Sequence, residues 1–228
     1  MKTKLSQQEF GFVNWGGKRC GAGRKPKGER AGVSHAKRPA LASRYPVLVT
    51  MRLWAGLPSL RYNDSHAVLM RAFESATRES FRVVEYSVQS NHLHLIVESK
   101  DESALGRGMI GLTVRIARGL NKLWGRRGSV FGDRYHARIL RTPREVRNAL
   151  VCVLMNARKH NAWRVLRADP YSSGAWFEGW SCSEFEHAAP SNLAQPRSRF
   201  LARPRTWLLS VGWQRHGRID PRECPAAA

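Results

Sequence analysis

Residues 81–98 have the sequence FRVVEYSVQSNHLHLIVE, and this stretch decides the predicted fold. The β-branched and aromatic residues of 81–88 predict one strand, and 92–98 predicts a second. The short turn between them makes the two strands a hairpin. Alternate residues of a strand face the same side, so His92 and His94 share one face while the leucines after each of them pack on the other.

Further elements are predicted on either side of this hairpin. They are a strand over 46–53, helices over 65–79, 102–124 and 143–160, and a fourth strand over 135–140. Ser65 is the expected N-cap of the first helix, and Pro143 stands at the start of the last. The order β-α-β-β-α-β-α predicts an α+β fold, a ferredoxin-like split βαβ core with an antiparallel sheet and one additional helix.

The chain divides by composition into three regions. Residues 1–45 hold eleven Lys or Arg against two Glu and are rich in Gly and Pro, which predicts a basic disordered arm. Residues 46–176 form the expected globular domain, and 177–228 form a C-terminal extension. Within that extension, 186–206 is rich in Pro, Ser and Arg and predicts a linker.

The net charge of +22 and the pI of about 11.2 favour a polyanionic partner. Nucleic acid fits better than a membrane surface, because no long apolar run or basic amphipathic helix with a clean apolar face is present. No apolar segment lies within residues 1–15, so we expect a cytoplasmic, DNA-associated protein. The four cysteines form no CxxC pair, which disfavours a zinc site.

Two groups of side chains could carry chemistry. His92 and His94, on one strand face, suit a divalent metal, although from these residues alone the pattern favours two partly exposed histidines without a metal. On the helix over 143–160, Cys152 and Asn156 are four residues apart and should be neighbours. Their ordinary roles would be a small buried side chain and a surface amide.

These groups together resemble a known family. The run SNHLHLIVE at 90–98 resembles the HUH signature of single-tyrosine transposases, including the REP-associated tyrosine transposases. The runs VFGDRYHAR at 130–138 and ALVCVLMNARKH at 149–160 look like the family's strand of aromatic and basic residues and its catalytic helix, and DPYSS at 169–173 is also similar. The resemblance covers about residues 46–176 in matching order.

The resemblance implies a metal-dependent enzyme of DNA transposition. In the family, two histidines and a polar helix residue bind Mg²⁺ or Mn²⁺, and a tyrosine on that helix cleaves single-stranded DNA at hairpin ends through a phosphotyrosine intermediate. Carried over, His92, His94 and Asn156 become metal ligands. Cys152 occupies the position of the expected tyrosine, which leaves Tyr135 as a fallback nucleophile.

Basic residues complete the expected DNA-binding surface. They are Arg24, Lys25 and Lys27 in the arm, and Arg115, Arg118, Lys122, Arg126, Arg127, Arg134 and Arg138 in the domain. We expect hairpin-bearing single-stranded DNA as the partner, no membrane, and we allow for a homodimer. The alternative to a transposase is a catalytically inactive DNA-binding relative, because of Cys152. An RNA-associated role ranks last, because no strand carries an aromatic RNA-binding motif.

Overall fold

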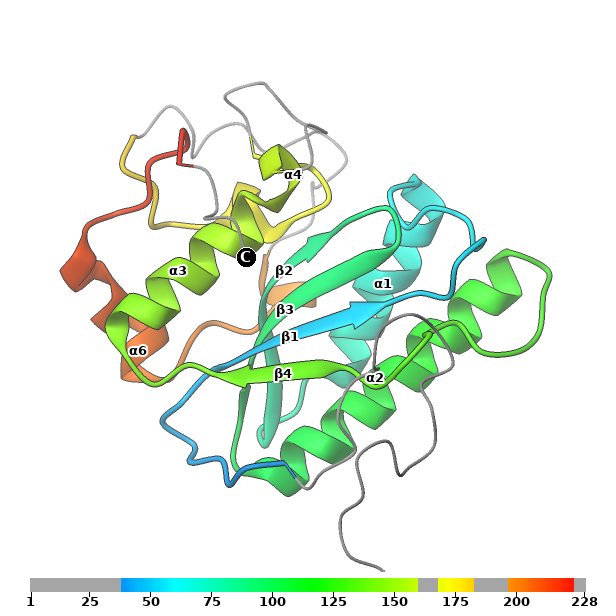
Figure 1. Ribbon diagram of the computed structural model, residues 1–228, viewed down its shortest axis with the longest axis horizontal. Helices are drawn as coiled ribbons and strands as arrows, with labels where there is room; N and C mark the ends of the chain where they lie inside the picture. Colours follow the sequence, from blue (N-terminus) through cyan, green and yellow to red (C-terminus); the bar gives the residue numbers. More distant parts are fainter. Residues whose placement is uncertain (1–37, 160–167, 183–196, 224–228) are drawn as a thin grey trace, which may run out of the picture. The chain divides into compact units, whose positions relative to one another are not determined.

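The computed structural model describes residues 38–159, 168–182 and 197–223. Its centre is one four-stranded sheet in the order β2-β3-β1-β4, with every neighbouring pair antiparallel. The strands are β1 (Val47–Arg52), β2 (Phe81–Val88), β3 (His92–Ser99) and β4 (His136–Ile139). β3 lies between β1 and β2, so the α+β prediction and its split βαβ order are confirmed (Figure 1).

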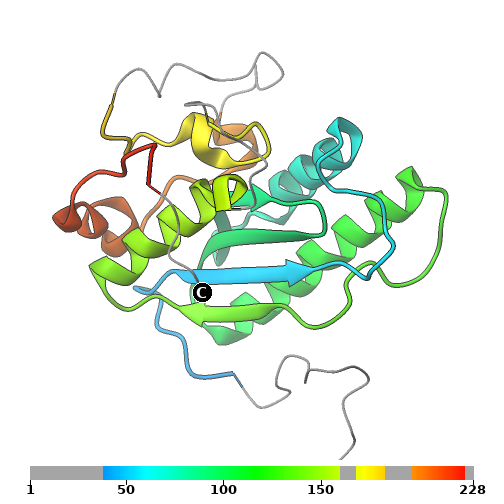
Figure 2. The same cartoon turned by 45° about the horizontal axis from the view of Figure 1, so that its top comes forward.

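The two faces of the sheet carry two separate apolar clusters. Helices α1 (Asn63–Ala76) and α2 (Glu102–Leu123) cover the face that buries Val49 and Leu95. The opposite face buries Ile96 under α3 (Pro143–Leu154). Figure 2 shows α3 and the two long helices on opposite sides of the strands. Alternation along the strands therefore sorts side chains between two interiors.

The predicted helices form with shifted ends. α1 begins two residues before Ser65, with Tyr62 at the N-cap position, and Ser65 is buried inside the helix. The prediction that Ser65 caps this helix is therefore wrong. α1 ends at Ala76 because Thr77 is already extended. α2 is capped as a long helix should be, by Asp101, whose side chain accepts from Ala104 N at 2.7 Å.

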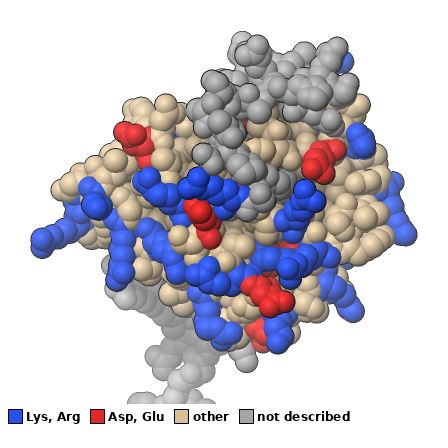
Figure 3. Space-filling view, turned by 180° about the vertical axis from the view of Figure 1, so that it is seen from behind, with Lys and Arg blue, Asp and Glu red and all other residues tan. Residues whose placement is uncertain are grey.

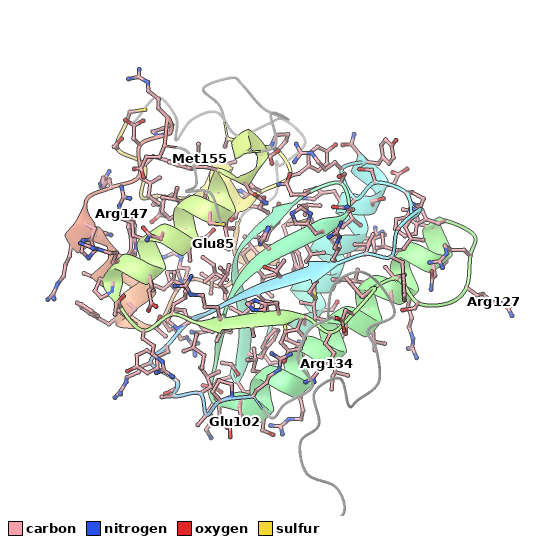
Figure 4. The ribbon with its side chains drawn as sticks, in the orientation of Figure 1. Glu85, Glu102, Arg127, Arg134, Arg147 and Met155 are labelled. Atoms are coloured by element: carbon pink, nitrogen blue, oxygen red, sulfur yellow. The ribbon has the colours of Figure 1, made fainter. Side chains whose placement is uncertain are left out.

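The third helix starts as predicted but is interrupted. Thr142 and Glu145 form a reciprocal capping box, with Pro143 in the first turn. Met155 then leaves helical geometry at φ −104° and ψ 11°, and a separate short helix, α4 (Asn156–Lys159), follows. Figure 4 labels Met155 at this break. The continuous helix predicted over 143–160 is therefore two helices.

Residues 168–176 lie beside β2, joined to it by one isolated antiparallel bridge between Ser87 and Ser172, and end in the turn η1 (Ser173–Trp176). Val88 N donates to Tyr171 O at 2.8 Å. Asp169 forms a bidentate pair with Arg61, with both N–O distances at 2.8 Å, and Arg61 also donates to Val88 O. The DPYSS motif therefore has a structural role here, which is to fasten this segment to the edge of the sheet.

The C-terminal extension is part of the globular body. It contains α5 (Arg197–Phe200), α6 (Trp207–Ser210) and η4 (Gly212–His216). Leu201 is buried in the main core, and Ala202 N donates to Val83 O of the edge strand at 2.9 Å. The predicted linker over 186–206 is therefore wrong for its described part, 197–206. Because β2 is an edge strand, some of its backbone carbonyls have no partner within the sheet, and residues 197–206 supply a donor to the one at Val83.

The end of the predicted arm also packs on the body. Leu41 is buried in the main core, and its backbone N lies 3.4 Å from a carboxylate oxygen of Glu102. Figure 4 labels Glu102 at the start of α2. Arg38 lies over the ring of Tyr135, 3.8 Å from its centroid. Residues 1–37, with Arg24, Lys25 and Lys27, lie outside the described residues. Among the helices that the structure does describe, none combines the length and apolar character needed to cross a bilayer.

Candidate metal and nucleic-acid site

His92 and His94 lie at the start of β3 on the face shared with α3. Their ring centroids are 5.0 Å apart and the rings are nearly perpendicular, at 87°. Both side chains are partly exposed, while Leu93 and Leu95 on the other face are fully buried. The placement is the one that strand alternation predicts.

The Nδ1 atom of each ring is held by a neighbouring side chain. His94 Nδ1 lies 3.0 Å from Thr50 Oγ1, and His92 Nδ1 lies 2.9 Å from Asn91 Oδ1. An amide oxygen only accepts, so His92 Nδ1 donates and Nε2 carries the lone pair. Metal-binding histidines are oriented in this way, through a hydrogen bond on the nitrogen that does not coordinate. The donor set therefore fits a divalent metal.

The strand register places further polar residues beside the pair. Thr50 pairs with His94 on one side and with His136 on the other, and His94 also pairs with Ser87. Ser87, His94, Thr50 and His136 thus form one row across all four strands. His136 is exposed on the histidine face. The sequence argument missed it, because the face of His136 follows from the register of β4 against β1 and not from local spacing.

Asn156, the predicted third ligand, lies at the start of α4 and is 2% exposed. Its Nδ2 has no hydrogen-bond partner within the part of the chain that the structure describes. In that same part, no group of three or more His, Cys, Asp or Glu side chains could hold a metal. A third protein ligand would therefore come from outside these residue types, as the amide oxygen of Asn156 would, or water and phosphate oxygens would complete the site.

The two sides of α3 face different parts of the molecule. Glu145 lies 3.4 Å from Arg138 of β4. Its carboxylate accepts hydrogen bonds, and the largest effect, from the backbone N–H of Arg141, lowers the pKa of Glu145. Arg147, on the other side, pairs with Glu223 at 2.6 Å and extends away from β4 (Figure 4). Cys152 lies two turns after Glu145, so it belongs to the same side of α3 as Glu145, and it is partly exposed.

Tyr135 lies on the opposite face of the sheet. It packs against the main core and lines a pocket of about 470 Å³ with Met109 and Ile110 of α2. Burial raises the pKa of its hydroxyl, against the effect of Arg38 and Arg134. The structure therefore does not bring the fallback nucleophile to the histidines.

The predicted DNA-binding residues separate between the two faces. Arg115, Arg118 and Lys122 are exposed on α2, on the side of the sheet away from the histidines. Figure 3 views the molecule from behind and shows Lys and Arg side chains spread over that surface. Arg127 projects from the loop after α2, and Arg134 is exposed before β4 (Figure 4). Among the members of the set that the structure describes, Arg138 alone lies on the histidine face.

Arg126 has a structural role instead of an exposed one. Its guanidinium donates to Asn121 Oδ1 at 3.0 Å and to Ser129 O at 3.3 Å. It is partly buried. These bonds hold the loop that leads from α2 toward β4.

One solved structure, of a REP-associated tyrosine transposase bound to a REP hairpin, is similar to this chain, with a TM-score of 0.49 and 17% identity. The match covers 75% of this chain and 98% of the other. No family profile matches the chain. No curated protein matches it in sequence either.

Proposed function

We propose that this chain is a DNA-binding protein of the HUH type, with a Mg²⁺ or Mn²⁺ site on His92 and His94. The observation that carries the proposal is the pair of imidazoles on one strand face, each held at Nδ1 by a neighbouring side chain. When bound there, the metal would act as a Lewis acid toward a DNA phosphate. Asn156 is the candidate protein ligand that would join them.

The chain's own residues would position the DNA strand around this site. Thr50 and Asn91 orient the two rings, so the imidazole nitrogens need little reorganisation on binding. His136, Arg138 and Arg52 are exposed on the same face and suit phosphate oxygens. Hairpin-bearing single-stranded DNA is the substrate class that we propose.

Cleavage of a DNA strand needs a nucleophile, and position 152 does not hold the tyrosine that the resemblance implies. Position 152 holds cysteine, whose side chain is shorter than the expected tyrosine and whose attack on phosphorus would leave a phosphorothioester. Tyr135 lies on the other face. Binding without cleavage is therefore the function that the geometry supports best. Cleavage and strand transfer, as in an active transposase, are the second candidate, which the resemblance of 90–98 and 149–160 favours.

The proposal is tested by metal and DNA binding together. Mn²⁺ binding to the intact chain is followed by electron paramagnetic resonance, and binding of a hairpin-tailed oligonucleotide by fluorescence anisotropy with Mn²⁺ or EDTA. His92→Ala and His94→Ala should each weaken Mn²⁺ binding at least tenfold. His216→Ala, at an exposed histidine of η4, is the matched control. Equal Mn²⁺ affinity in all variants would refute the metal site, and absence of DNA binding would refute the DNA partner.

A further inference from the structure

A groove lies at the end of the β2–β3 hairpin that is remote from His92. It has a volume of about 1010 Å³, and Arg44, Arg78, Lys100, Arg205 and Trp207 are among its lining residues. Four of these are cations, and all four are exposed. We call it the Trp207 groove.

The carboxylates of the groove do not cancel this charge. Glu98 is buried and accepts hydrogen bonds from the Arg82 guanidinium and from the backbone and hydroxyl of Thr206. Its charge is therefore satisfied internally. Glu79 lies 4.0 Å from Arg205 with its side chain 94% exposed, so water and salt screen that pair.

The remaining cations are available to an anion. Within the described residues, no Asp or Glu lies at ion-pair distance from Arg44, Arg78 or Lys100. Three unneutralised cations around one groove raise the local concentration of polyanions. An acidic peptide or a nucleic-acid strand would satisfy this charge equally.

Trp207 favours the nucleic acid. It is the first residue of α6 and is half exposed although it lies at the groove. The edge of its ring packs on the backbone of Gly212, where a Cβ would come within 2.6 Å of the ring, and Arg215 lies 4.8 Å from the ring centroid. The indole is therefore held in place, as a stacking platform for an unpaired base requires.

We infer that the Trp207 groove is a second nucleic-acid site, which binds backbone phosphates through Arg44, Arg78 and Lys100 and stacks one base on Trp207. This inference rests on the proposed DNA partner. His92 is the first residue of β3 and Ser99 is the last, so they are seven residue steps apart, or about 23 Å. That distance equals roughly seven nucleotides along one strand of a duplex. A DNA ligand that fills both sites must therefore extend well beyond the histidines.

The test compares matched charge removals in the full chain. The triple variant Arg44→Ala, Arg78→Ala, Lys100→Ala removes the groove cations. The control Arg71→Ala, Arg144→Ala, Arg222→Ala removes three exposed charges that line none of the pockets described above. Affinity for a long-tailed DNA hairpin is measured between about 50 and 200 mM KCl.

For the groove variant, the slope of log K against log salt should fall by about 2 to 3, since each lost phosphate contact removes about 0.7 to 0.9. For the control variant, this slope should fall by less than about one. Trp207→Ala should weaken single-stranded binding by about fivefold to a hundredfold, and Trp207→Phe should retain most of it. A tail too short to span both sites should show none of these differences.

Two results would overturn the inference in distinguishable ways. If the wild type binds DNA but the groove variant and its control lose equal slope, the groove does not contact phosphates, and the histidine-site proposal stands. If the wild type binds an acidic peptide and no DNA, the proposed DNA function fails as well. Circular dichroism and the melting temperature of each variant establish that the fold is intact.

Discussion

Thr50 contacts one histidine of the candidate metal site through its hydroxyl. Its Oγ1 lies 3.0 Å from His94 Nδ1, and its backbone pairs with both His94 and His136. Thr50→Val keeps the shape of the side chain and the strand but removes the hydrogen bond. We predict that Mn²⁺ affinity falls by about 10- to 100-fold, the usual effect of losing such a partner. Titration calorimetry measures it, with Thr113→Val on α2 as control, and unchanged affinity would mean that Thr50 does not orient the ring.

His66 is a buried neutral histidine far from this chemistry. Burial, and secondarily the charge of Arg61, lowers its pKa from 6.5 to about 4, and its Nε2 lies 3.0 Å from Tyr86 Oη. Burial also raises the pKa of Tyr86. Both groups are thus held neutral inside the main core.

The shift at His66 predicts a defined pH dependence of stability. The folded pKa is below the unfolded value, so unfolding takes up a proton between pH 6.5 and about 4. The free energy of unfolding should therefore fall as pH drops through this window, by about 3 kcal/mol in all. His66→Gln should lack this component in urea titrations. Parallel pH profiles of variant and wild type would contradict it.

At the scale of elements, a largely buried ion pair helps to fix the segment 168–176 to the sheet, beside its hydrogen bonds with β2. The Arg61 and Asp169 side chains are 17% and 3% exposed. Removing one partner leaves the other charge buried, so Asp169→Ala should lower the free energy of unfolding by about 3–5 kcal/mol. Glu74→Ala, which breaks the exposed pair with Arg199, should cost about 1 kcal/mol or less. Urea unfolding measures both, and equal effects would mean that Asp169 is not a fastening residue.

How far the sequence predicts these elements depends on the range of the interactions that fix them. Strand alternation and the hairpin turn are local, so 81–98 and the faces of His92 and His94 were predictable. The capping box at Thr142 is local too. The pairing of Glu98 with Thr206 joins residues 108 positions apart, and no local pattern announces it. The packing of 197–206 could not be predicted for this reason.

Within the candidate site, the same distinction separates what was found from what was missed. The two histidines share one strand, so their common face follows from spacing alone. Tyr135 was not assigned to a face, because that required the register of β4 against β1. This register places His136 opposite Thr50 and so turns Tyr135 to the other side. Asn156 was placed beside Cys152 on a continuous helix, which the break at Met155 interrupts.

At the scale of the whole molecule, positive charge is distributed over the arm and both sheet faces. The arm before Arg38 contains nine Lys or Arg. Leu41 is buried and Arg38 stacks on Tyr135, so a truncation that preserves the body must stop at residue 37. Deleting 1–37 should reduce the salt slope of DNA binding by several units without changing the melting temperature. An unchanged slope would mean that the arm does not contact phosphates.

The most direct test of the whole account is a denaturing gel of hairpin-tailed single-stranded DNA incubated with Mn²⁺ and the wild type, Cys152→Tyr, or Cys152→Tyr with His92→Ala. The account predicts no covalent adduct from the wild type. It predicts an adduct from Cys152→Tyr that disappears in EDTA and in the double variant, because residue 152 holds the position of the family's tyrosine in the resemblance of 149–160 and His92 is a proposed metal ligand. An adduct from the wild type would contradict the proposed binding without cleavage. A folded, DNA-binding Cys152→Tyr that forms no adduct would contradict the placement of residue 152 at the metal site.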